Sequence, residues 1–145
     1  MSFETIEQKA GPGAGKEYES SDLRIMVITK PEEIGDLNGW VSDAAISELN
    51  MLEYKPSFAI VVFQGRKPTD RYSVQIERIT RSGDKVRVFI KLLEPPQDQA
   101  KNDIITSPYH LVSVQKTDSW AQNVTFEVVD SLTNTVIAST ISYVP

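Results

Sequence analysis

The sequence predicts a mainly β fold: an antiparallel two-layer sandwich or open barrel, immunoglobulin-like, with a small helical insertion near residues 31–52. From residue 58 onward, apolar and polar residues alternate with a period of two, which is typical of strands that bury one face. The connections between these segments are too short to contain the crossover helices that a parallel sheet requires. The period and the short connections together favour antiparallel pairing.

The N-terminal part of the chain contains two predicted strands and the helical insertion. Residues 3–8 alternate well enough for a short edge strand, and the Gly-rich residues 10–16 predict a loop. That loop is not a phosphate-binding P-loop, because Glu17 occupies the position of the required Ser or Thr. Residues 23–29 predict a buried strand. The insertion begins at Pro31, whose missing N–H costs nothing in a first helical turn.

The rest of the chain predicts further strands. The apolar run 58–63 is expected of a central strand. The alternating segments that follow it are 72–77, 86–92, 109–114, 124–128 and 137–143. Residues 81–84 and 130–134 have the composition of hairpin connections. The long polar segment 94–107 is either a functional loop or a surface crossover between the sheets.

The composition predicts a single domain over residues 1–145 and excludes several kinds of site. The chain has 145 residues, of which 40% are hydrophobic and 24% charged, as in ordinary globular proteins. It contains no Cys, which excludes disulfides, thiol nucleophiles and Cys-bound metals. With one His, a site that needs two imidazoles cannot form within one chain. We therefore expect no cofactor and no metal.

The charge balance argues against nucleic acid as a partner. The chain has 20 acidic and 15 basic residues, and its net charge of −5 repels a polyanion. No apolar run approaches the roughly 20 residues of a membrane span. The first residues show no signal peptide, so the sequence as written predicts a cytoplasmic protein, or an extracytoplasmic one if a signal peptide has been removed.

The residue types do not predict an enzyme. His110 is the imidazole available as a base, and Ser107, three residues earlier, would point to the opposite face of an extended strand. No spacing among the acidic residues selects a catalytic pair. Enzyme activity would require a deep pocket around His110 with a carboxylate within reach.

The segment 64–72 is the candidate contact surface. It joins two predicted strands and places three cations within six residues. Pro68 fixes φ, and Tyr72 offers a large amphipathic ring. Arg and Tyr are enriched as anchors in protein interfaces, whereas a solvated turn would use the cations only to balance nearby acids. The candidate residues are Arg66, Lys67, Pro68, Thr69, Asp70, Arg71 and Tyr72.

Two motifs in this region resemble a known family. The first runs over residues 58–76 as an apolar strand, Gly, a basic pair, Pro-Thr, two further residues, a Tyr, and an alternating strand. The second is Thr-Ser-Pro-Tyr-His at 106–110, followed by Leu-Val and by Lys116. In this order the motifs resemble the C-terminal domain of protease complex subunit PrcB, and the resemblance covers residues 58–116.

The resemblance implies a noncatalytic protein partner of a peptidase, which it assembles with or restrains. It adds Pro108, Tyr109 and His110 to the contact surface if both motifs meet at one end of the sandwich. The family has Gly-Gly where this chain has Asp70-Arg71, and because Arg tolerates positive φ poorly, we expect a turn of different shape. The alternative is a structural or assembly protein with no peptidase partner.

A more distant similarity is to chagasin-like inhibitors of cysteine peptidases. These are immunoglobulin-like sandwiches that insert an Asn-Pro-Thr-Thr-Gly-Tyr turn into the cleft of the target. Residues 67–72 of this chain resemble that turn in Pro68, Thr69 and Tyr72 and differ from it at the other positions. The similarity implies a way in which such a loop could bind a peptidase.

Overall fold

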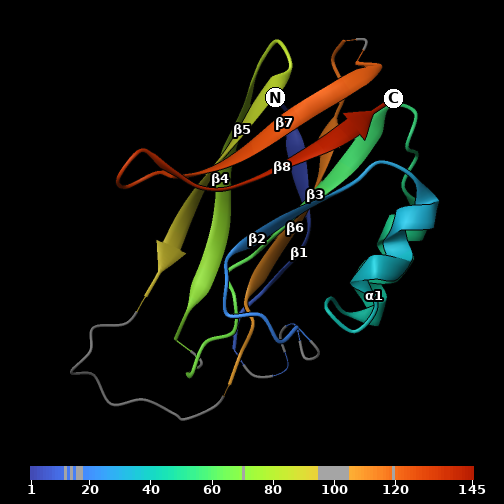
Figure 1. Cartoon of the computed structure of the whole chain (residues 1–145). Helices are drawn as coiled ribbons and strands as arrows, with labels where there is room; N and C mark the ends of the chain where they lie inside the picture. Colours follow the sequence, from blue (N-terminus) through green and yellow to red (C-terminus); the bar gives the residue numbers. More distant parts are fainter. Residues whose placement is uncertain (12, 14, 16–17, 70, 95–104, 119) are drawn as a thin grey trace.

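Two four-stranded sheets face each other, which confirms the predicted mainly β sandwich (Figure 1). The structure is a computed structural model that describes residues 1–11, 13, 15, 18–69, 71–94, 105–118 and 120–145. The first sheet contains, in spatial order, β1 (Phe3–Lys9), β6 (Tyr109–Gln115), β3 (Ser57–Phe63) and β2 (Arg24–Ile28). The second sheet contains β4 (Ser73–Ser82), β5 (Lys85–Leu93), β7 (Gln122–Asp130) and β8 (Thr135–Val144).

One strand pair corrects the prediction of antiparallel sheets. β5 and β7 are parallel, in register from Lys85 opposite Thr125 to Ile90 opposite Asp130, whereas the other pairs are antiparallel. The chain leaves the second sheet after β5, forms β6 in the first sheet, and returns as β7. A strand in the opposite sheet therefore makes the crossover for which parallel pairing usually needs a helix.

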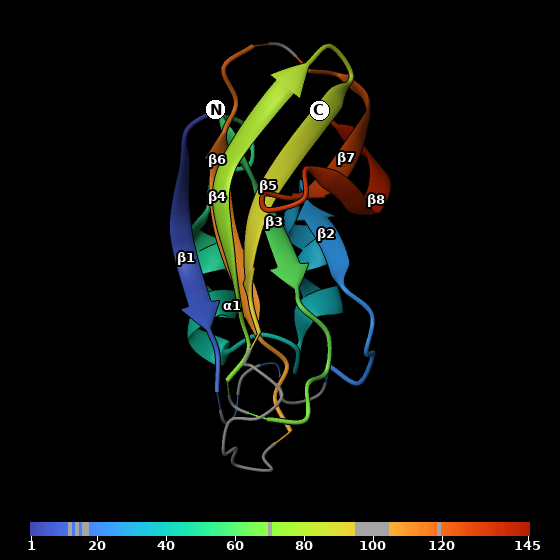
Figure 2. The same ribbon diagram turned by 90° about the vertical axis from the view of Figure 1, so that its left-hand side faces the viewer.

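The predicted helical insertion is confirmed as two short helices. A 3₁₀ helix, η1 (Pro31–Leu37), is followed by the α-helix α1 (Asp43–Met51). The Ser42 hydroxyl caps α1 by accepting a hydrogen bond from the Ala45 N–H at 3.1 Å. α1 lies on the side of the first sheet that faces away from the second sheet (Figures 1 and 2). In the described part of the chain, no helix is long and apolar enough to cross a membrane.

β3 is packed on both of its faces, which explains its continuous apolar run. Phe58 and Ile60 belong to the core between the two sheets. Ala59 and Val61, which point the other way, belong to a second core between the first sheet and the helical insertion. The prediction of a central strand is confirmed, because β3 lies between β6 and β2.

Candidate functional site

The structure brings the two motifs together at one end of the sandwich. β3 and β6 are paired along their lengths, and the contact continues beyond both strands. The Gln64 N–H donates to the Pro108 carbonyl at 2.9 Å. Farther along, Lys67 and Thr106 exchange backbone hydrogen bonds of 2.7 and 2.9 Å. The turn after β3 and the residues before β6 thus form one unit, at the lower end of the molecule in Figure 1.

The candidate contact residues divide into a surface set and a buried set. Arg66, Pro68 and Arg71 are exposed, and Lys67 and Tyr72 are half-buried. Thr69, Pro108, Tyr109 and His110 are buried. Asp70, and positions 95–104 of the predicted loop 94–107, lie outside the described residues. The surface set can touch a partner directly, whereas the four buried residues can affect a partner only by supporting the turn from the interior of the protein.

The surface set is held by contacts inside the turn. The Thr106 hydroxyl donates to the Thr69 carbonyl at 2.8 Å, which fixes the middle of the turn to the second motif. The Lys67 ammonium lies 5.3 Å from the centroid of the Tyr72 ring, within cation–π range. The cation and the ring are therefore presented together rather than as two independent side chains.

Residues 18–22 contact the start of the turn, at Gly65 and Arg66, and support it there. The sequence patterns did not predict this contact. The Arg66 N–H donates to the Ser20 carbonyl at 2.8 Å. Next to it, Gly65 has a φ of +100°, and a Cβ at this position would lie 2.4 Å from the Ser21 carbonyl oxygen. A glycine between strands is the signal for such a close approach, but it does not say which segment approaches.

His110 links the two sheets and has both ring nitrogens occupied. Its Nδ1 accepts a hydrogen bond from the Ile76 N–H of β4 at 2.8 Å. Since Nδ1 accepts, the proton of the neutral ring is on Nε2, which donates to the Thr5 hydroxyl of β1 at 2.8 Å. Burial disfavours the imidazolium and lowers the pKa of His110 to about 4. The side chain is 2% exposed, so the described residues leave no open pocket at this base.

Tyr109 connects the second motif to β1 and to the start of α1. Its hydroxyl donates to the Glu7 carboxylate and accepts a hydrogen bond from the Ser42 N–H at 3.2 Å. The Ser42 hydroxyl also donates to Glu7, which closes a three-residue network. Burial, together with the hydrogen bond to Glu7, raises the pKa of Tyr109. The Tyr of the second motif therefore has a structural role, because its hydroxyl joins β6 to β1 and to the start of α1.

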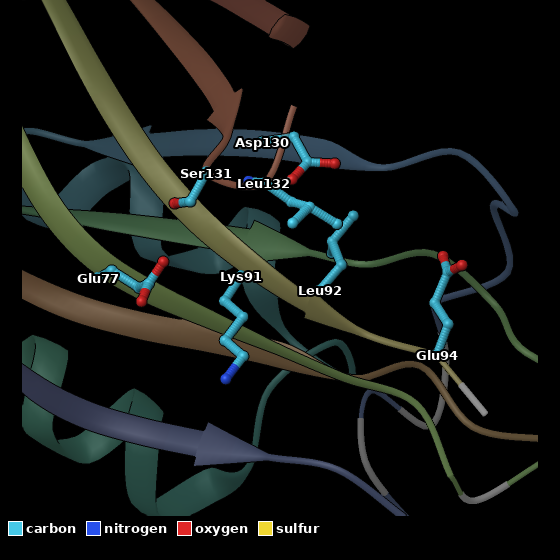
Figure 3. Close-up of a pocket in the computed structure, with 7 residues that line it drawn as sticks. All are labelled: Glu77, Lys91, Leu92, Glu94, Asp130, Ser131 and Leu132. Carbon is cyan, nitrogen blue, oxygen red and sulfur yellow. Dashed lines mark hydrogen bonds between the residues drawn. The ribbon is translucent and has the colours of Figure 1, made fainter. Parts of the chain in front are cut away.

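A cavity of about 570 Å³ lies away from both motifs, at the end of β5 and beside the β7–β8 connection (Figure 3). Its lining residues are Glu77, Lys91, Leu92, Glu94, Asp130, Ser131 and Leu132. The three carboxylates lie at separate points around the cavity rather than converging on one position (Figure 3). Within the ranges that the structure describes, no group of three or more His, Asp or Glu side chains could hold a metal ion.

The comparison with known families matches the segment that carries this site. Residues 58–115 match the sequence model of the family described as PrcB C-terminal. The matched segment covers about two-fifths of the chain. It contains β3, the turn, β4, β5 and β6, and its bounds agree within one residue with the predicted 58–116. The chain matches no curated protein and no solved structure. The similarity to chagasin-like inhibitors stays a prediction.

The PrcB-like turn departs from the Gly-Gly pattern without backbone strain at Arg71. Among the described residues other than glycine, positive φ values occur at Ala121 and Asn134. Arg71 therefore occupies an ordinary backbone region, in which an Arg side chain costs nothing. The Arg71 N–H lies 3.4 Å from the Thr69 hydroxyl oxygen, which closes the turn on its C-terminal side.

Proposed function

We propose that this chain is a noncatalytic subunit of a protease complex and that it binds its peptidase partner through the surface set of the PrcB-like turn. The observation that carries the proposal is the position of the turn inside the matched segment 58–115, with Arg66 and Arg71 exposed and the buried motif residues behind them. A turn that is held from both sides loses little conformational entropy when a partner binds it.

The charge of the turn defines the partner surface. The chain carries a net charge of −5, so a group of three cations is a local exception to the overall field. Arg66, Lys67 and Arg71 favour an acidic surface on the partner, because complementary charge speeds association and selects against wrong partners. The Lys67–Tyr72 pair adds an aromatic ring of the kind that is enriched among the strongest contacts of protein interfaces.

The surroundings of His110 support the noncatalytic part of the proposal. A general base needs a free nitrogen near a bound substrate. Here one nitrogen accepts from the Ile76 N–H, and the other donates to the Thr5 hydroxyl. The ring therefore acts as a fixed bridge between strands.

A structural or assembly role without a peptidase partner is the second candidate. The observation that favours it is the burial of Thr69, Pro108, Tyr109 and His110, since residues that hold a fold together produce a sequence motif without any partner. The two candidates differ in what they predict for the exposed cations, which the structural role does not need.

A charge-reversal experiment separates the two candidates. The tagged chain is used to capture complexes from its native cells, and the recovered proteins are tested for a peptidase by mass spectrometry and by proteolytic activity. The variant Arg66→Glu/Lys67→Glu should lose the peptidase. The control Lys30→Glu/Lys55→Glu makes the same charge change at exposed positions outside the turn and should retain it. Equal recovery by both variants, or no peptidase with the wild-type chain, would contradict the proposal.

A further inference from the structure

A small pocket beside the turn has a buried floor and an exposed rim. Its volume is about 140 Å³, below the roughly 300 Å³ at which sites for small-molecule ligands begin. The floor contains three buried residues, Tyr18, Thr106 and Ser107. The rim contains three exposed residues, Glu19, Arg66 and Ile105. A pocket of this size and shape fits the end of one side chain that enters from the rim.

The floor is held in place by contacts within the protein. The Tyr18 ring stacks on Phe63, with 4.4 Å between the ring centroids. The Tyr18 carbonyl accepts a hydrogen bond from the Ser107 hydroxyl at 3.0 Å. Gly15, which also lines the pocket, is packed so closely that a Cβ there would lie 2.5 Å from the Ser107 carbonyl oxygen. The pocket is therefore formed before a ligand arrives, which reduces the entropy that binding costs.

Two opposite charges at the rim are unpaired. In the described part of the chain, neither the Arg66 guanidinium nor the Glu19 carboxylate has a hydrogen-bond or ion-pair partner. An ionised carboxylate only accepts hydrogen bonds, and a guanidinium only donates them. A ligand that satisfies both groups must therefore accept from Arg66 and donate to Glu19.

The two hydroxyls of the floor cannot donate to a ligand. The Thr106 hydroxyl donates its proton to the Thr69 carbonyl at 2.8 Å, and the Ser107 hydroxyl donates to Tyr18. A hydroxyl has one proton, so each of these oxygens can only accept a further hydrogen bond. Among the side chains that line the pocket, the acceptors thus outnumber the single donor, Arg66.

This balance of charges and donors selects the ligand class. A carboxylate would accept from Arg66, but Glu19 would repel it, and the hydroxyls of the floor could not donate to it. An ammonium group would donate to Glu19, but Arg66 would repel it. A primary carboxamide is neutral and has one acceptor oxygen and two N–H donors, so it can bind both charged groups without repulsion.

We propose that this pocket binds a primary carboxamide, which the peptidase partner supplies as the end of an Asn or Gln side chain. The amide oxygen accepts from Arg66, and the amide nitrogen donates to Glu19. Arg66 thereby determines specificity in addition to contributing charge to the surface set. The assignment of the carboxamide to the partner rests on the proposed function, whereas the chemistry of the pocket does not.

Three probes of nearly equal size and different charge test the pocket without a partner. Propanamide, propanoate and propylammonium are titrated into the ¹⁵N-labelled chain, and the amide signals of Gly15 and Ser107 are followed by NMR. Propanamide should shift these signals saturably, with a dissociation constant in the millimolar range that suits so small a ligand. Propanoate and propylammonium should bind at least about threefold more weakly, because each loses one charged hydrogen bond and meets a like charge.

Substitutions at the rim test the two contacts. Arg66→Met and Glu19→Met remove one hydrogen-bonding partner each and keep the length of the side chain, so each should weaken propanamide binding by about threefold or more. Lys67→Met removes a cation of the surface set that does not line the pocket, and Glu48→Met removes an exposed acid on α1. Both controls should bind propanamide like the wild type.

The probe experiment and the partner experiment fail separately. Absence of a saturable shift with propanamide, tighter binding of either charged probe, or equal binding by Arg66→Met and Lys67→Met would overturn the carboxamide pocket, whether or not a peptidase is captured. In capture from native cells, Glu19→Met should recover less peptidase than Glu48→Met. Equal recovery by these two variants would overturn the assignment to the partner and leave the proposed function standing. Failure of the wild-type chain to recover a peptidase would overturn both.

Discussion

The buried His110 should make the stability of this protein depend on pH in a specific range. The neutral ring accepts from the Ile76 N–H and donates to the Thr5 hydroxyl, and it joins the edge of β4 to β1 and β6. Protonation would place a second N–H opposite the Ile76 N–H, so that two donors would face each other without an acceptor. The folded state therefore disfavours the imidazolium, and the unfolded state does not.

The size and the sign of the effect follow from the two pKa values. Burial lowers the pKa of His110 from 6.5 to about 4 in the folded protein, which corresponds to about 3 kcal/mol. Between these values the unfolded chain binds more protons than the folded one, so the free energy of unfolding increases with pH. The contribution of neutral His110 to the free energy of unfolding is fully present above pH 6.5. It is lost as the pH falls from 6.5 to about 4.

Urea unfolding of the wild type and of His110→Gln, at a series of pH values from 7.5 to about 3.5, measures the contribution. Tryptophan fluorescence is a suitable probe, because Trp120 is buried in the core between the sheets. A Gln side chain can accept from one partner and donate to the other but does not titrate in this range. The carboxylates titrate alike in both proteins, so the difference between the two curves isolates His110. Parallel curves across the whole range would refute the reasoning.

Two further substitutions test the contacts that hold the turn and the second motif. Gly65→Ala should lower the free energy of unfolding by about 2 kcal/mol or more, because the added Cβ meets a backbone carbonyl at a positive φ. Gly83→Ala, which has a positive φ but no atom within 4 Å, should cost less in the same urea titration, and equal losses would contradict the steric argument. Tyr109→Phe removes the hydroxyl that binds Glu7 and should cost about 1–2 kcal/mol by thermal and urea unfolding. Tyr143→Phe, on the exposed face of β8, should change stability by less than about 0.5 kcal/mol, so a similar loss in both variants would argue against the buried network.

The strands and the helical insertion could be predicted because they depend on local periodicity. The alternation after residue 58 and the Pro31 start of the insertion are local signals, and both led to elements that the structure contains. The parallel pairing of β5 with β7 could not be predicted in this way. It depends on which sheet receives β6, and that choice is made by packing between segments far apart in the sequence.

The candidate contact residues show the same difference between local signals and long-range packing, because the sequence does not tell which of them are exposed and which are buried. The two motifs contain Arg, Pro, Tyr and His in an order that predicts a turn and a contact surface, and nothing in that order says which side chains point outward. Pairing of β3 with β6 places Tyr109 and His110 in the interior, where Glu7 and Thr5 of β1 meet them across about a hundred residues of sequence. A hydrogen bond between residues so distant has no local signature, because it requires β1 and β6, which lie at opposite ends of the sequence, to be paired in the first sheet.

The sequence by itself determined the fold class, the similarity of the segment 58–115 to the PrcB C-terminal family and the basic turn, since each is recorded in consecutive residues. Only the tertiary structure decided that Arg66 and Arg71 lie on the surface while Thr69 and His110 lie inside. The physical reason is that exposure is a property of the packed chain: a residue becomes surface or core only when distant segments cover it or leave it open.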